Sequence, residues 1–228
     1  MRIGLLNRSV APLSIAVFLI LLCASLVMPQ AHGRSTDVAG RYNVSGTNPD
    51  GGQYSGSLEI ISRGSVYQFR WNAGSQYDGI GIRNGKFVAV AFASGNDGAG
   101  CGVVDYTITN DGTLDGRWGY WGKTSSGTER ATRISGRSLE GEYTATGTNL
   151  DGTRYQVKIS VRSAASGYHF TWNNNSEGFG IRRGDNVAVG IGGERCGFVS
   201  YEIRQDGTLD GIWGGYGSER TGTENAKR

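Results

Sequence analysis

The chain has 228 residues, of which 39 are glycine and 3 are proline, and its 23 basic and 20 acidic side chains give a formal net charge of +3. These charges are interspersed, so the chain lacks the basic cluster that displaces counterions from a nucleic acid. Composition and charge therefore exclude a nucleic-acid partner and predict a mixed, solvated surface.

Residues 1–33 predict an N-terminal signal helix. Arg2 and Arg8 precede an apolar run that ends at Met28, and Ala31-His32-Gly33 offers the small residues that a signal peptidase recognises. The alternative is an uncleaved anchor, because the run approaches the ~18 residues of a spanning helix. We expect cleavage after Gly33, which leaves a secreted or periplasmic chain without a membrane span. Because the signal holds two arginines and no acid, 21 basic and 20 acidic residues remain.

The remaining chain consists of two copies of one unit. Tyr67-x-Phe-x-Trp71 returns at residues 168–172, and Asp111-Gly-Thr-Leu-Asp-Gly116 returns at residues 206–211. The offset falls from 101 positions at the start of the unit to 95 at its end, so the second copy has lost six residues. The sequence thus predicts a first β repeat at 34–135 and a second at 136–228.

Apolar residues alternate with polar ones throughout both repeats. Tyr67, Phe69 and Trp71 fall on one face of a predicted strand, with Gln68 and Arg70 on the other. Glycine-containing turn dipeptides at 50–51 and 84–85 are typical of β-hairpins. We expect an all-β protein of two tandem antiparallel units, each with about eight short strands. Up-and-down barrels are the favoured architecture because they leave no exposed edge, and β-sandwiches are the alternative.

No catalytic residue, metal site or cofactor is predicted. After cleavage His169 is the sole histidine, and the sequence has no Gly-x-Ser-x-Gly motif. Glu129 and Glu224 end the repeated Gly-Thr-Glu segments, and either could form half of an acid–base pair. The partner in such a pair would be Asp105 or Asp115. A structural ion pair with Arg83 or Arg182 is the favoured interpretation, so we do not expect an enzyme.

Two cysteines and three aromatic residues are the remaining candidates for a defined role. Cys101 and Cys196 occupy equivalent positions and predict a possible disulfide, the alternative being two separate thiols. Trp121, its counterpart Tyr216, and Tyr120 are candidate exposed contact residues for binding, with core packing as the alternative.

The repeated phrases resemble a known group of proteins. Gly-x-Tyr-x-Val-x-Gly-x-Asn-Pro-Asp-Gly at 40–51, Tyr-x-Phe-x-Trp at 67–71 and Asp-Gly-x-Leu-x-Gly-x-Trp at 111–118 are similar to motifs of small exported bacterial β-repeat proteins. Members are often catalogued as fibronectin-binding or uncharacterised. The resemblance implies an envelope or extracellular binding protein and supplies no catalytic residue.

Three functions follow as hypotheses. The first is an exported, non-catalytic binding or adhesion protein of the cell envelope, whose two repeats gain avidity for a protein or matrix component. The second is a carrier that holds a small apolar ligand inside its barrels. The third is an envelope hydrolase that uses the repeated carboxylates.

Overall fold

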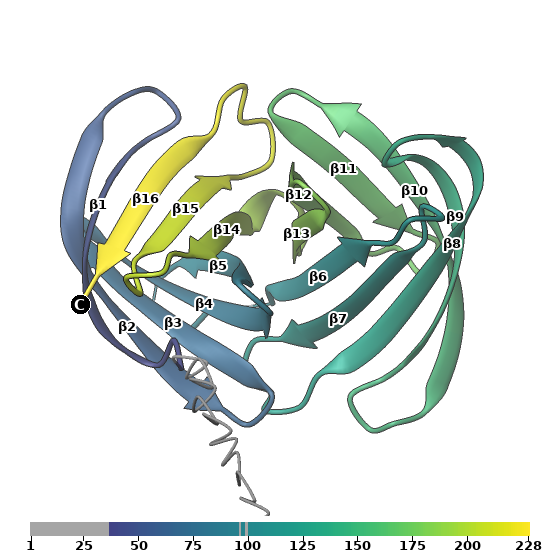
Figure 1. The fold of residues 1–228 in the computed structure, drawn as a ribbon, viewed down its shortest axis with the longest axis horizontal. Coiled ribbons are helices and arrows are strands. Elements are labelled where there is room, and N and C mark those ends of the chain that lie inside the picture. Colours follow the sequence, from purple (N-terminus) through teal and green to yellow (C-terminus); the bar gives the residue numbers. More distant parts are fainter. Residues whose placement is uncertain (1–36, 96, 99) are drawn as a thin grey trace, which may run out of the picture. The chain divides into compact units, whose positions relative to one another are not determined.

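The computed structural model describes residues 37–95, 97–98 and 100–228, so the predicted signal at 1–33 lies outside the described residues. The described chain forms sixteen strands and one short 3-10 helix, η1 (Gly193–Arg195). The strands build two closed, eight-stranded antiparallel barrels (Figure 1), which confirms the all-β, two-barrel prediction. In this part of the chain we find no helix with the length and apolar character needed to cross a membrane.

Barrel A combines strands from the two ends of the described chain. It contains β1 (Gly40–Thr47), β2 (Gln53–Arg63), β3 (Val66–Ala73), β4 (Ser75–Asn84), β5 (Phe87–Ser94), β14 (Gly197–Ile203), β15 (Leu209–Gly214) and β16 (Gly222–Lys227). In Figure 1, yellow β15 and β16 accordingly lie with the purple and blue strands.

Barrel B is built from one continuous stretch of chain. It contains β6 (Gly102–Ile108), β7 (Leu114–Tyr120), β8 (Gly127–Arg137), β9 (Glu140–Thr148), β10 (Arg154–Ala164), β11 (Gly167–Trp172), β12 (Glu177–Arg183) and β13 (Asn186–Ile191). Barrel B is therefore inserted between β5 and β14 of barrel A.

The barrels do not coincide with the sequence repeats. Each repeat supplies eight strands, but the boundary at residues 135 and 136 falls inside β8. β5 pairs with β14, where Val90 faces Val199, instead of pairing with β6 of its own repeat. In the same way β13 pairs with β6, where Val189 faces Val104. Each barrel consequently takes five strands from one repeat and three from the other.

In each barrel a buried tyrosine bonds to the backbone just before the first strand of a repeat. In barrel A, Tyr42 donates a hydrogen bond to the carbonyl oxygen of Val38 at 2.8 Å, and both side chains are buried. Tyr143 makes the equivalent bond to the carbonyl oxygen of Leu139 at 2.7 Å in barrel B. These bonds fold the segment before the first strand of each repeat back against the core.

A third apolar cluster lies between the barrels, and we call it the inter-barrel layer. It consists of Val66, Ile80, Ile82, Ala89, Ala91 and Ala93 from barrel A, Val103 and Ala188 from barrel B, and Cys101 and Cys196. The outer faces of β4 and β5 are thus buried as well as their inner faces. Alanine on the outer face of β5 lets the two sheets approach closely.

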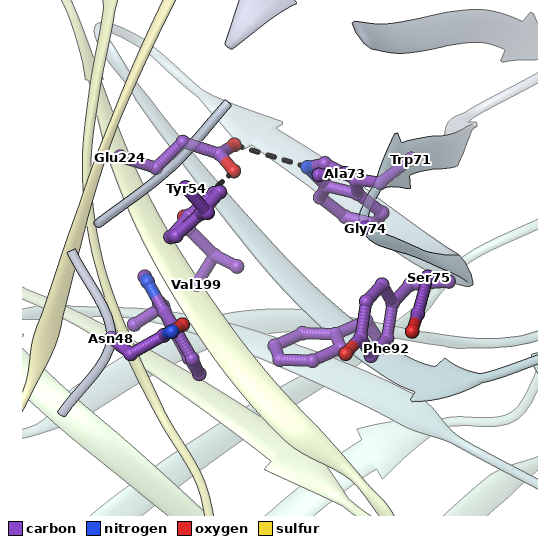
Figure 2. A pocket seen from close by; sticks show the side chains of 11 residues that line it. Asn48, Tyr54, Trp71, Ala73, Gly74, Ser75, Phe92, Val199 and Glu224 are labelled. Atoms are coloured by element: carbon purple, nitrogen blue, oxygen red, sulfur yellow. Dashed lines mark hydrogen bonds between the residues drawn. The ribbon is translucent and has the colours of Figure 1, made fainter. Parts of the chain in front are cut away.

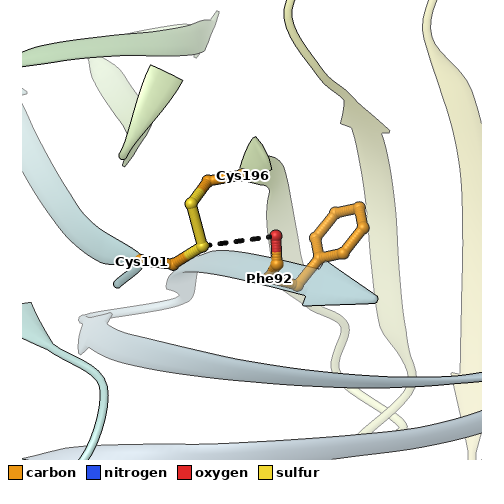
Figure 3. Close-up of a disulfide and its surroundings, with 3 residues drawn as sticks. All are labelled: Phe92, Cys101 and Cys196. Atoms are coloured by element: carbon orange, nitrogen blue, oxygen red, sulfur yellow. Dashed lines mark hydrogen bonds between the residues drawn. A yellow bond between two sulfur atoms is a disulfide. The ribbon is translucent and has the colours of Figure 1, made fainter. Parts of the chain in front are cut away.

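Cys101 and Cys196 form a disulfide within this layer (Figure 3). Cys101 ends the connection from β5 to β6, and Cys196 ends the connection from β13 to β14. These are the two places where the chain passes from one barrel to the other. The disulfide therefore fastens both crossings to each other.

Candidate ligand-binding cavities

Barrel A holds a cavity of about 430 Å³ (Figure 2). Asn48 of the β1–β2 turn, Gly74 of the β3–β4 turn and Ser75 at the start of β4 contribute to its lining. The cavity therefore reaches the loops at one end of the barrel, while its other lining residues come from the strands. Its full lining is Asn48, Tyr54, Trp71, Ala73, Gly74, Ser75, Tyr77, Phe92, Val199, Trp213 and Glu224.

A buried carboxylate, Glu224, lines this cavity and accepts three hydrogen bonds from aromatic side chains. Oε1 accepts one from the Trp71 indole Nε1 at 3.0 Å and one from the Tyr201 hydroxyl. Oε2 accepts one from the Tyr54 hydroxyl at 3.0 Å (Figure 2). Glu224 is only 4% exposed, so these bonds replace most of the hydration of its carboxylate.

Barrel B repeats this arrangement around Glu129 in a second cavity of about 430 Å³. Oε1 accepts hydrogen bonds from Trp172 Nε1 at 3.2 Å and from the Tyr106 hydroxyl, and Oε2 accepts one from the Tyr155 hydroxyl at 2.9 Å. We call each set of one glutamate, one tryptophan and two tyrosines a tetrad. The two tetrads match residue by residue at offsets of 101 and 95.

Each tetrad is assembled from both repeats. In barrel A, Tyr54 and Trp71 come from the first repeat and Tyr201 and Glu224 from the second. In barrel B the contributions are reversed. Neither cavity is therefore complete within a single sequence repeat as the chain is folded here.

Burial and hydrogen bonding change the pKa values of Glu224, Tyr201 and Tyr106. Burial raises the pKa of Glu224, and hydrogen bonds from Tyr201, Trp71 and Tyr54 oppose that shift. Burial and the adjacent carboxylate raise the pKa of Tyr201 and of Tyr106 well above the usual tyrosine range. These tyrosines thus remain protonated donors at neutral pH.

Aromatic rings meet edge to face around the wall of each cavity. In barrel A, the ring centroid of Phe92 lies 5.9 Å from that of Tyr77 and 6.1 Å from that of Trp213. The interplanar angles are 84° and 72°. In barrel B, Trp118 meets Tyr120 at 5.8 Å and 78°. This geometry is the favourable one for aromatic pairs, and it holds the rings in fixed orientations.

Glycine is required beneath the wall tryptophans. A Cβ atom at Gly222 would lie 2.4 Å from the carbonyl oxygen of Thr47 and 2.5 Å from the Trp213 indole. At Gly127 the same atom would lie 2.4 Å from the Thr148 carbonyl oxygen and 2.4 Å from Trp118. Both indoles therefore rest directly on the backbone of the neighbouring strand.

The two cavities differ in their outer walls. Tyr77 and Phe92 of barrel A correspond to Ser176 and Ile191 of barrel B, whereas Tyr120 of barrel B corresponds to Gly215. Both cavities thus have the same carboxylate and hydrogen-bond donors, but the shape of the cavity beside this tetrad differs. Barrel B is lined by Val104, Trp118, Tyr120, Glu129, Asn149, Tyr155, Val157, Trp172, Asn174, Ser176 and Ile191.

The structure places the three candidate contact residues in different surroundings. Tyr120 lines the cavity of barrel B. Trp121 is partly buried against the inter-barrel layer. Tyr216 is 47% exposed and packs edge-on against Phe179 of barrel B, with 5.0 Å between the ring centroids. They do not form one surface: Trp121 lines a separate pocket of about 300 Å³, and of the three only Tyr120 lines one of the two tetrad cavities.

The carboxylates have partners other than those expected from the sequence. Glu129 and Glu224 bond to aromatic donors, where the sequence suggested Arg83 or Arg182. Neither proposed acid–base partner lines a cavity: Asp105 is buried beside Asn186, and Asp115 is exposed and 3.5 Å from Arg130. Each lining therefore contains a single carboxylate rather than a pair.

Sequence reasoning singled out the glutamates and tryptophans but not their tyrosine partners. Tyr54 recurs as Tyr155 at the same offset as the neighbouring tryptophan, and Tyr106 recurs as Tyr201 at the same offset as the glutamate. The tetrad could thus have been predicted from four residues with polar tips that are the same in both repeats. Within the described residues, no group of three or more potential metal ligands is assembled.

Comparisons with protein-family models, with curated proteins and with solved structures find no match to this chain. Function is therefore inferred from the geometry of the cavities.

Proposed function

We propose that this protein binds small molecules, one in the cavity of each barrel. The observation that carries the proposal is the presence of the same buried tetrad beside an open cavity in both barrels. A concave, mostly apolar site with a few fixed polar groups is typical of small-ligand recognition. Of the hypotheses drawn from the sequence, this geometry supports a carrier more strongly than adhesion.

Export is part of this proposal. The N-terminal segment has the features of a signal peptide, and disulfides such as Cys101–Cys196 persist in oxidising compartments. A periplasmic or secreted carrier would meet its ligand outside the cytoplasm.

The test is to block each cavity separately. Ala73 and Asn174 line the two cavities at equivalent positions, so Ala73→Trp and Asn174→Trp should each fill one of them. We expect native mass spectrometry of the purified mature chain to detect up to two small molecules. Each variant should lose one of the two.

The matched control is Arg41→Trp, because the Arg41 side chain is 87% exposed on the outside of barrel A. Arg41 lines neither of the two tetrad cavities, so this variant adds the same ring elsewhere and should leave binding unchanged. If both cavity variants bind a ligand as the wild type does, the cavities are not the binding sites and the proposal is wrong.

A further inference from the structure

We propose that each cavity accepts an organic cation, with an ammonium group placed against the buried glutamate and between the aromatic faces. This inference deepens the proposed function and depends on it. It assigns the ligand to the class of amines and quaternary ammonium compounds.

The charge of the cavity linings favours a cation. Each cavity is lined by one carboxylate, and no lysine, arginine or histidine occurs among the described residues that line either cavity. Three donors compensate each carboxylate in part, but a buried charge without a counter-charge remains costly. A cationic ligand supplies the missing positive charge.

The hydrogen-bonding capacity of each glutamate also favours an amine. Oε1 of Glu224 accepts two hydrogen bonds, from Trp71 and Tyr201, whereas Oε2 accepts one, from Tyr54. A carboxylate oxygen can accept two, so Oε2 retains capacity for one further donor. Oε2 of Glu129 is in the same situation, with one bond from Tyr155. An N–H group of an amine can donate this further hydrogen bond.

The aromatic wall of each cavity favours a cation as well. Tyr54, Trp71, Tyr77, Phe92 and Trp213 line the cavity of barrel A, and Trp118, Tyr120, Tyr155 and Trp172 line that of barrel B. The faces of aromatic rings carry negative potential and attract cations, most strongly those of tryptophan. Aromatic walls and a carboxylate therefore favour the same ligand charge.

Other ligand classes fit less well. A neutral apolar ligand would displace water from the carboxylate without replacing its interactions. An anion would be repelled by the glutamate and by the ring faces. Asn48 and Asn149 stand at equivalent positions in the two linings and provide neutral polar contacts for the remainder of the ligand.

The experiment compares probes of one shape and three charges. Phenethylammonium, 2-phenylethanol and 3-phenylpropanoate are titrated into the mature protein, followed by calorimetry and tryptophan fluorescence. Choline and its neutral analogue 3,3-dimethylbutan-1-ol test the quaternary case. We expect each cation to bind roughly ten-fold or more tightly than its neutral counterpart and the anion not to bind.

Glu224→Gln and Glu129→Gln then remove one negative charge from one cavity each. Because glutamine retains an oxygen that accepts from tryptophan and tyrosine, we expect the fold to persist and the cation preference to disappear at that site alone. Glu59→Gln, on the outside of barrel A beside Arg41, is the matched control and should change nothing. Circular dichroism checks that each variant is folded.

The outcomes separate this inference from the proposed function. Equal affinity for cation and neutral probe, or unchanged preference in folded glutamine variants, overturns the cation assignment. The cavity proposal survives that result if Ala73→Trp and Asn174→Trp still abolish binding of the neutral probe. If a glutamine variant does not fold, the ranking of the probes on the wild type decides alone. Failure of both cations to bind also overturns the assignment.

Discussion

Three buried carboxylates of this protein differ in how many hydrogen bonds compensate their burial. Water hardly reaches Glu129, Glu224 or Asp105, but the three side chains differ in their hydrogen-bond partners. The glutamates each accept three hydrogen bonds. Asp105 accepts one from Asn186 at Oδ1, and its Oδ2 has no hydrogen-bond partner among the described residues. Asp105 is therefore the poorly compensated carboxylate of the three.

Burial raises the pKa of Asp105 to about 7, against smaller opposing effects of Asn186, Asn84 and Arg117. Above pH ~4 the unfolded chain has released this proton, whereas the folded chain keeps it until near pH 7. Unfolding thus releases a proton in this window, so stability falls as pH rises from 4 to 7. The loss of unfolding free energy over this pH range is on the order of 4 kcal/mol at most.

Asp105→Asn should remove this slope. Asparagine resembles the protonated acid, so we expect the variant to match the wild type near pH 4 and to be more stable by a few kcal/mol at pH 8. Urea unfolding at a series of pH values measures the effect. Asp105→Ser is a second variant, since Ser200 is the natural residue at the equivalent position of the other repeat. Parallel pH profiles for wild type and variants would contradict the prediction.

At the scale of strands, close contacts between backbone and aromatic rings position the cavity walls. Gly222→Ala would force β16 away from β1 or displace Trp213, because a backbone oxygen cannot yield as a flexible side chain can. We expect this variant to lose roughly 1–3 kcal/mol of unfolding free energy. Gly127→Ala should have the same effect through Trp118 in barrel B.

Gly215→Ala is the control for these variants. A Cβ atom there would have one neighbour, the Gly197 Cα at 3.8 Å, which is ordinary contact. Thermal unfolding of the three variants makes the comparison. Similar melting temperatures for all three would show that the glycines beneath the tryptophans are not needed for packing.

Strand positions and inward faces were predictable from the sequence, but the second buried face was not. The inward positions Phe69 and Trp71 are buried as their alternation predicts, with Arg70 exposed. On β5, Val88 and Val90 point inward while Ala89 and Ala91 are buried in the inter-barrel layer. Alanine is compatible with either a solvated or a buried outer face, so periodicity alone could not distinguish the two.

At the scale of the whole molecule, the connectivity of the barrels escaped prediction for a physical reason. β6 and β14 carry the same pattern, with Val104 and Tyr106 matched by Val199 and Tyr201. β5 can therefore satisfy its inward face equally well with either strand. The choice depends on the two crossings and on the layer between the barrels, which involve contacts distant in sequence.

The continuous course of barrel B predicts that it can fold alone. We expect a fragment of residues 101–192 with Cys101→Ser to form a closed barrel, because all eight strands are present and ~90 residues suffice for an independent core. Nuclear magnetic resonance and hydrogen exchange would detect the fold, and one binding site should remain. A fragment that stays unfolded under conditions where the full chain is native would contradict this prediction.

The insertion of one barrel into the other also sets an order of assembly as the chain emerges, N-terminus first, from a ribosome or a translocation channel. The first five strands of barrel A appear early but cannot close, because β1 and β5 wait for partners that end at Lys227. Barrel B is complete once residue 191 has emerged. During that interval two strand edges are open to pairing with other chains, which is the period when this protein is most exposed to aggregation.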